Sequence, residues 1–211
     1  MQDNMKAALP LFPCVYFGPV QWYAHAVRQP QITLDIHEHY LKQTWRNRIR
    51  IAGANGIQDL IIPVSTSGNH TPMQDIRIDA SKSWQKHHWQ SIQSAYGKSP
   101  FFEFYADQIA ALYQKDFEKL TDFNIAGIQL MLKLLKIKTT TAETNSFVPY
   151  NDIQDLRLLI SPKSKIQDAA FIPQRYIQVF EERHGFQPNL CILDLLFCTG
   201  PMAANYFTVQ L

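Results

Sequence analysis

Apolar residues come in short runs separated by turn residues over the first part of the chain. Runs of this length and composition are typical of β-strands. One exception lies between the first two runs, where residues 20–28 indicate a helix that stops before Pro30. The predicted strands are residues 7–12, 32–36, 46–52, 57–64 and 75–79.

The third and fourth runs flank the sequence Gly53-Ala54-Asn55-Gly56. Asn-Gly between two β-type runs is a strong hairpin signal. We therefore predict a tight turn at Asn55-Gly56, with a positive φ angle at Gly56. Pro63 places the second run at the edge of a sheet or marks its end.

From Ser83 onward the apolar pattern takes the period of a helix. Trp84, His88, Ile92 and Ala95 form one stripe, which we expect to face inward, with Ser83 as the helix cap. Strands come early and helices late, so we expect an α+β or mixed α/β fold, in which a strand- and hairpin-rich N-terminal part packs with a helical C-terminal part. The predicted helices are residues 84–96, 101–113, 120–136, 175–184 and 190–197, and the polar residues 139–150 are expected to be a loop or a subdomain boundary in a single domain over residues 1–211.

Composition sets limits on function. Hydrophobic residues make up 46% of the 211 positions, enough for a real core, and the net charge of +2 gives no general attraction to nucleic acid or membrane. Residues 125–135, the longest strongly apolar stretch, are too few to span a bilayer. The three cysteines form no even disulfide framework, and residues 1–8 contain no apolar leader, so we expect a cytoplasmic protein.

Basic residues cluster in one window. Residues 40–57 contain no Asp or Glu, yet Lys42, Arg46, Arg48 and Arg50 fall within nine positions. Strand alternation would place the three arginines on one face, where their planar guanidinium groups suit phosphate or carboxylate. We predict that Lys42, Arg46 and Arg48 bind a phosphate-bearing ligand. A solvated hairpin face, with the arginines paired to acids elsewhere, would explain the same pattern.

Acidic and histidine residues precede this window. Asp35, His37 and His39 share one face if the strand continues, and their spacing of two could present ligands to a metal. No further His or Cys lies nearby in sequence, so no metal is assigned. Acid–base chemistry by Asp35, or pairing of Asp35 or Glu38 with the arginines, explains these residues better.

His88 is the main candidate for proton transfer. It belongs to the inward stripe of its predicted helix, so it must find a hydrogen-bond partner or open onto a cleft. In the functional interpretation it is a general acid or base with a pKa near the working pH, at the floor or rim of the pocket that holds Arg46 and Arg48. In the ordinary interpretation it is a half-buried histidine bonded to a carbonyl group or a tyrosine.

Known catalytic signatures are absent from the sequence. It has no Walker loop, no G-x-G-x-x-G, no G-x-S-x-G and no CxxC, so no cofactor is assigned. Cys191 and Cys198 lie seven positions apart in an apolar segment, which indicates packing residues and not nucleophiles.

Two segments resemble the WbqC-like protein family: residues 35–48 (DIHEHYLKQTWRNR) and 84–92 (WQKHHWQSI), the latter continuing through Tyr96 to Ser99-Pro100-Phe101-Phe102. Tyr16-Phe17-Gly18 near the start is similar to the family as well. So is ILDLLF at residues 192–197, followed by Gly200-Pro201. The longer family members carry a Thr- and Gly-rich segment before the closing motif, and residues 151–186 contain nothing like it.

The resemblance implies a bacterial surface-polysaccharide (O-antigen) context and a transferase that adds glycine or another aminoacyl group to a sugar. The alternative is a non-catalytic protein that binds a nucleotide-sugar or an enzyme of the same pathway. In either case we expect a nucleotide-sugar or sugar phosphate as partner, no nucleic acid and no membrane span, while a homo-oligomer stays open. The candidate site comprises the catalytic residues His88 and Asp35 and the ligand-binding residues Lys42, Arg46, Asn47, Arg48 and Tyr96.

Overall fold

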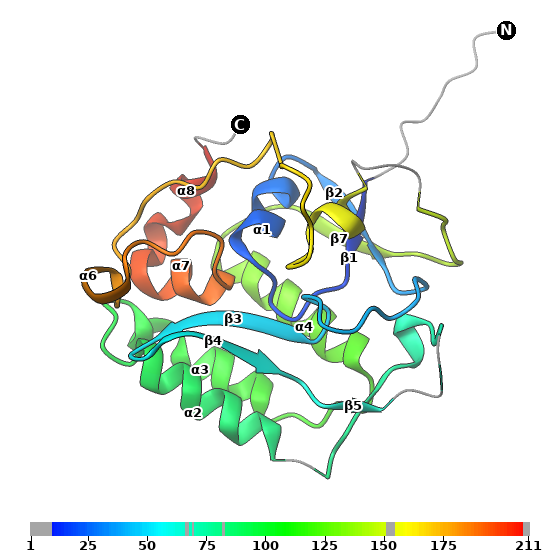
Figure 1. The fold of residues 1–211 in the computed structure, drawn as a ribbon, viewed down its shortest axis with the longest axis horizontal. Helices are drawn as coiled ribbons and strands as arrows, with labels where there is room; N and C mark the ends of the chain where they lie inside the picture. Colours follow the sequence, from blue (N-terminus) through cyan, green and yellow to red (C-terminus); the bar gives the residue numbers. More distant parts are fainter. Residues whose placement is uncertain (1–9, 66–67, 69, 82, 151–154, 209–211) are drawn as a thin grey trace, which may run out of the picture.

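A three-stranded parallel sheet lies at the centre of the computed structural model (Figure 1), which describes residues 10–65, 68, 70–81, 83–150 and 155–208. Its strands are β1 (Leu11–Pro13), β2 (Gln31–Asp35) and β7 (Thr140–Glu143), in the order β1-β2-β7. Both pairs are parallel. Helix α1 (Val20–Ala26) connects β1 to β2, because parallel neighbours require a crossover connection.

A β-hairpin forms a second layer. Strand β3 (Arg48–Gly53) pairs antiparallel with β4 (Gly56–Ile61), and the short strands β5 (Val64–Ser65) and β6 (Arg77–Ile78) form a separate antiparallel pair. Figure 1 shows α2 and α3 packed beneath the hairpin, with β4 on the side nearer α2. The helices are α2 (Trp84–Tyr96), α3 (Phe102–Tyr113), α4 (Leu120–Leu134), α5 (Leu156–Leu159), α6 (Glu181–His184), α7 (Ile192–Thr199) and α8 (Ala203–Thr208), with 3-10 turns at Met73–Asp75 and Gly200–Met202.

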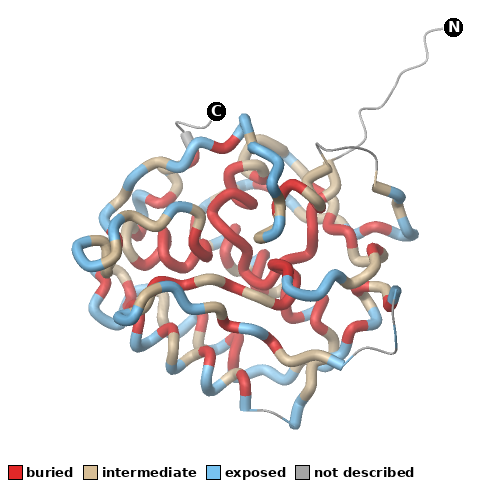
Figure 2. Tube along the Cα trace, viewed as in Figure 1, coloured by how far each residue is buried: buried red, intermediate tan, exposed pale blue. Residues whose placement is uncertain are grey.

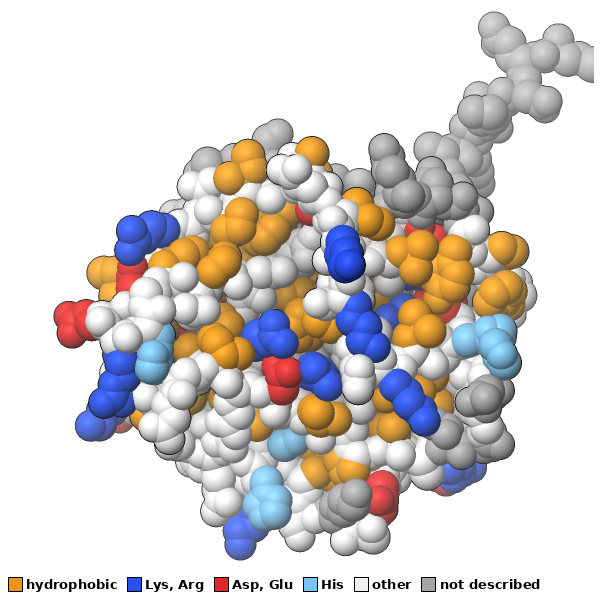
Figure 3. All heavy atoms as spheres, in the orientation of Figure 1, with side chains coloured by type: hydrophobic (Ala, Val, Ile, Leu, Met, Phe, Trp, Pro, Cys, Tyr) orange, Lys and Arg blue, Asp and Glu red, His pale blue; other side chains and the backbone are white. Residues whose placement is uncertain are grey.

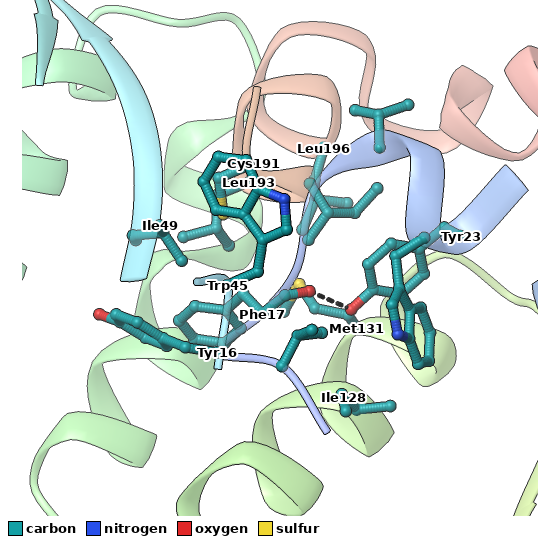
Figure 4. Close-up of a cluster of buried hydrophobic side chains, with 14 of the residues drawn as sticks. Tyr16, Phe17, Tyr23, Trp45, Ile49, Ile128, Met131, Cys191, Leu193 and Leu196 are labelled. Carbon is teal, nitrogen blue, oxygen red and sulfur yellow. Dashed lines mark hydrogen bonds between the residues drawn. The ribbon is translucent and has the colours of Figure 1, made fainter. Parts of the chain in front are cut away.

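Aromatic residues dominate the core. Buried residues concentrate at the centre of the molecule, whereas the turns of α2 and α3 alternate between buried and exposed positions (Figure 2). Figure 4 shows side chains from α4 and α7 converging around Phe17, whose carbonyl oxygen accepts a hydrogen bond from the Tyr23 hydroxyl at 2.6 Å. A Cβ atom at Gly127 of α4 would lie 3.3 Å from the Phe17 ring, so glycine permits this close packing.

The structure confirms the main predictions of secondary structure. The fold is mixed α/β, with strands mostly early and helices late. The hairpin forms between the two predicted strands, and Gly56 has the predicted positive φ, +110°. The turn itself is Ala54-Asn55, one position earlier than predicted, because Gly53 pairs with Gly56. Trp84, His88, Ile92 and Ala95 are all buried on the inner face of α2. No helix among the described residues is long and apolar enough to cross a membrane.

Three local predictions were wrong. Residues 140–143, expected within a polar loop, form β7, because their backbone groups find partners along β2. The helix expected from residue 175 is limited to residues 181–184, since the preceding segment is held by side-chain hydrogen bonds of Gln178. Ser83 makes no side-chain cap bond to α2. Of the first predicted strand, residues 7–9 lie outside the described residues.

Candidate functional site

A hollow of about 560 Å³ lies between the edge strand β4 and helix α2. Helical spacing brings Trp84, His87 and His88 to the same side of α2, where they meet the end of β4. Its volume is within the range of small-molecule sites. The lining residues are Ile61, Pro63, Ser83, Trp84, His87 and His88.

His88 forms part of the wall of this hollow, and its ring is held by the core. The Tyr16 hydroxyl lies 2.9 Å from Nδ1 of His88, and Tyr16 in turn bonds to the hydroxyl of Tyr113. Burial lowers the pKa of His88 to about 4, with a smaller lowering from His87, against a raising effect of the Ile61 backbone. Such a pKa favours the neutral ring at physiological pH. The contact with Tyr16 is the one that the ordinary interpretation of this histidine predicted.

Trp84 lines the same hollow. The residue is 4% exposed, and its indole Nε1 is enclosed and has no hydrogen-bond partner within the part of the chain that the structure describes. A buried donor without a partner costs about 1–3 kcal/mol of stability.

Two arginines share one carboxylate on the outer face of the hairpin. Arg48 Nη1 donates to Asp59 Oδ2 at 2.9 Å, and Arg50 Nε donates to Asp59 Oδ1 at the same distance. One positive charge is left in excess, and Arg48 Nε has no partner among the described residues. Figure 3 shows Lys and Arg side chains gathered in the middle of this face, over the hairpin.

This arginine pair lies next to the hollow. Arg48 is paired in register with Ile61, and side chains directly opposite each other in an antiparallel pair project to the same face. Ile61 lines the hollow of His88. An anion on Arg48 would therefore lie beside a ligand in that hollow. Arg48 itself is not among the residues that line the hollow. The arginine pair and the His88 hollow are therefore neighbouring parts of the surface, and not the single pocket that was predicted.

Arg46 does not belong to the arginine face, which corrects the predicted alternation. Strand β3 begins at Arg48, so Arg46 lies before it and points inward, where it is 1% exposed. Its guanidinium makes a bidentate pair with Glu38, with Nε at 2.7 Å from Oε1. Burial raises the pKa of Glu38, and Arg46 opposes that shift. Glu38 is thus one of the two acids expected to pair with the arginines.

Asp35 is equally enclosed. Its Oδ2 lies 2.6 Å from Arg157 Nη1, and its Oδ1 accepts the backbone N–H groups of His37 and Glu38 at 3.0 Å. All its oxygens are engaged away from the hollow, which leaves no room for the predicted catalytic role. Strand β2 ends at Asp35, so His37 and His39 do not continue its face. The described residues contain no group of three or more His, Cys, Asp or Glu side chains that could hold a metal.

The other predicted ligand residues are dispersed. Lys42 is exposed and lines a separate hollow of about 330 Å³ with His39 and His70. Asn47 is buried and donates to the Ile62 carbonyl at 2.9 Å. Tyr96 is fully buried against the ring of Phe197. Of the predicted site residues, only His88 and Arg48 come close to a common surface.

The cysteines are packing residues, in agreement with the sequence. Cys14 and Cys191 are buried, and burial raises the pKa of Cys191 to about 12. A thiol in this state is a poor nucleophile at neutral pH.

Several residues of the site were not predicted. Tyr16 and Tyr113 hold His88, and no local sequence pattern reports such distant partners. The partner of Asp59 was missed because the turn is one position earlier than predicted: counting from Ala54-Asn55 pairs Asp59 with Arg50, whereas counting from Asn55-Gly56 pairs it with Ala52. Trp84 was assigned to the core stripe alone, although its indole N–H signals a need for a partner.

Comparison with known proteins identifies the family of the chain. A model of the WbqC-like protein family matches residues 31–172, which is more than half of the chain and includes the hairpin, α2 and His88. The chain therefore belongs to the WbqC-like protein family. It is 26% identical over 192 residues to the uncharacterized protein Rv1507c of Mycobacterium tuberculosis, covering 79% of this chain and 83% of that relative. No solved structure matches the chain.

Proposed function

We propose that this protein binds a phosphate-bearing sugar derivative, a nucleotide-sugar or a sugar phosphate, in surface-polysaccharide assembly. The pathway rests on the resemblance to the family. The observation that carries the ligand class is the shared carboxylate: among the described residues, Arg48 and Arg50 both pair with Asp59, beside an open hollow.

The chemistry of this arrangement suits a phosphate ester. A guanidinium group presents parallel N–H donors that match phosphate oxygens, and the partly exposed side chains of Arg48 and Arg50 present two such groups. The excess positive charge attracts an anion and makes binding sensitive to salt. The sugar would then occupy the adjoining hollow, against the side chains of Trp84 and His88.

A transferase that adds glycine or another aminoacyl group to the sugar is the second candidate. The observation in its favour is that His88 is neutral and fixed in orientation by Tyr16 while lining the hollow. A neutral imidazole can accept the proton that an amine or hydroxyl loses as it attacks an activated acyl group, provided that His88 first gives up its contact with Tyr16 or with the Ile61 backbone. A phosphate bound on Arg48 would raise the low proton affinity of His88, since a nearby negative charge favours the imidazolium form.

Ligand-induced thermal stabilisation tests the binding proposal. The melting temperature is measured with nucleotides, nucleotide-sugars, sugar phosphates and glycine, because a ligand that binds only the folded state raises it. We expect a rise with at least one phosphate-bearing sugar in the parent protein and none in the Arg48→Ala variant. Arg77→Ala is the matched control, because Arg77 pairs with Glu118 on an exposed surface outside the site.

Two results would count against the proposal. One is a parent protein that responds to no ligand of the panel, and the other is an Arg48→Ala variant that responds like Arg77→Ala. Release of product from an activated aminoacyl donor, lost in a His88→Gln variant that still binds the phosphate-bearing sugar, would favour the transferase over a binding protein.

A further inference from the structure

A second hollow, of about 720 Å³, continues along α2 from the His88 hollow. It lies between the turn of the hairpin and the exposed flank of the helix. His87 lines both hollows, so the two adjoin at this side chain. The lining residues are Gly53, Ala54, Asn55, Gly56, Ile57, Gln58, His87, Gln90, Ser91, Ser94 and Ala95.

About half of the lining of this second hollow is polar, and it carries no acid, lysine or arginine among the described residues. Asn55, Gln58 and Gln90 present amides, and Ser91 and Ser94 present hydroxyls. Amides and hydroxyls both donate and accept hydrogen bonds, as sugar hydroxyls do. Gln58 Nε2 lies 3.5 Å from Ser91 Oγ, a long contact that leaves both groups able to bond a ligand.

The backbone of β4 adds further hydrogen-bonding groups. The Arg50 carbonyl points outward from β3, because it accepts from the backbone N–H of Cys191. In an antiparallel pair, two residues opposite each other direct their backbone N–H and C=O groups either both toward the partner strand or both away from it. The two arrangements alternate along the strand. Asp59 and Ile57 therefore direct their N–H and C=O groups away from β3. These groups lie along the free edge of β4, and Ile57 lines the second hollow.

We propose that this second hollow is the subsite for a neutral oligosaccharide, the acceptor or partner sugar chain of the ligand held at Arg48. The inference rests on the proposed function for the identity of the second ligand. The residues of α2 from Trp84 to Ala95 extend about 16 Å, which accommodates an oligosaccharide and exceeds the length of a single sugar ring. The chain end would reach the hollow of Trp84 and His88, next to the anion on Arg48.

Binding of defined neutral oligosaccharides tests this proposal. Hexose, N-acetylhexosamine and deoxyhexose trimers, with the matching monosaccharides, are titrated into the ¹⁵N-labelled protein and followed by NMR. We expect at least one trimer to shift amide signals of residues 53–58 and 87–95, and to bind more tightly than its monosaccharide. Ser94→Trp fills the hollow and should weaken that binding at least tenfold.

Gln93→Trp is the matched control, because Gln93 is exposed on α2 but does not line the hollow. Both variants should keep the parent response to the phosphate-bearing sugar at Arg48, which separates this test from that of the proposed function. No shift with any trimer at millimolar concentration would overturn the proposal. Equal binding by the Ser94→Trp and Gln93→Trp variants would overturn it too, as would binding of an extended peptide along β4 in place of the trimers.

Discussion

Tyr16 and His88, which are 72 positions apart, meet through a contact of 2.9 Å between the Tyr16 hydroxyl and Nδ1 of His88. Tyr16 follows the first strand of the central sheet, and His88 lies on α2 beneath the hairpin. Burial raises the pKa of Tyr16 well above its usual range, so the hydroxyl keeps its proton. The core therefore fixes the orientation of a ring that also lines a surface hollow.

The protonation of His88 gives the first prediction. With a pKa of about 4, the ring should not titrate between pH 5 and 8 in the free protein, as NMR of its ring protons can show. A phosphate-bearing sugar bound at Arg48 should raise this pKa. A pKa that stays the same in the saturated complex would place His88 in the core alone.

The same shift predicts a dependence of stability on pH. The folded state lowers the pKa of His88 from 6.5, so folding favours the neutral ring. This contribution is fully present above pH 6.5 and is lost as the pH falls from 6.5 towards 4, by about 3 kcal/mol. Urea denaturation of the parent and a His88→Gln variant across this window checks it. The variant should lose less stability than the parent as the pH falls, and equal losses would contradict the prediction.

Gly56→Val should destabilise the protein by about 1–3 kcal/mol, since a β-branched residue is strained at a φ of +110°. A Cβ atom at Gly56 would meet no atom within 4 Å, so backbone strain is the whole cause. Gly53→Ala is the control, because Gly53 has no positive φ and its Cβ would make ordinary contacts. Urea denaturation measures both free energies of unfolding, and equal values for the two variants would argue against strain at Gly56.

Local patterns in the sequence were sufficient for this hairpin and for α2. Asn55-Gly56 locates the turn to within one position, and the spacing of Trp84 and His88 sets the buried face of the helix. Strand β7 could not be found in this way, because its exposed and half-buried residues lack alternation and the strand depends on pairing with β2. A strand that is held in place by partners distant in the sequence need not show a periodic pattern of its own.

The candidate site shows the same limit. The arginine window was visible in the sequence, but which arginine faces solvent depends on where β3 begins. Arg46 lies two positions before the strand and points inward to Glu38, while Arg48 pairs with Asp59 on the surface. The partner of Asp35 is Arg157, which is 122 positions away and within the segment that lacks the Thr- and Gly-rich pattern of longer family members.

Arg46 should matter for stability and not for ligand contact. Arg46→Ala leaves Glu38 buried without its partner, which should cost about 3–5 kcal/mol. Lys42→Ala should change stability by less than about 0.5 kcal/mol, because Lys42 is exposed. Urea denaturation of both variants compares them directly. An Arg46→Ala variant as stable as the parent, with its ligand response lost, would show instead that Arg46 binds the ligand.

Asp59 should restrain anion binding, because it occupies the donors of both Arg48 and Arg50. Asp59→Asn removes the shared negative charge and leaves two guanidinium groups for the ligand. We expect the affinity for a phosphate-bearing sugar to rise about tenfold at low salt, and the gain to shrink as salt screens the charges. Stability should change by no more than about 1 kcal/mol, since these side chains are partly exposed.

Glu118→Gln is the matched control: it frees Arg77 in an exposed pair elsewhere and makes the same change in net charge. Isothermal titration calorimetry at two salt concentrations measures the affinities. If Asp59→Asn and Glu118→Gln bind alike, the gain comes from net charge and the arginine pair is an ordinary solvated hairpin face. If Asp59→Asn alone gains affinity, the carboxylate and the ligand compete for Arg48 and Arg50.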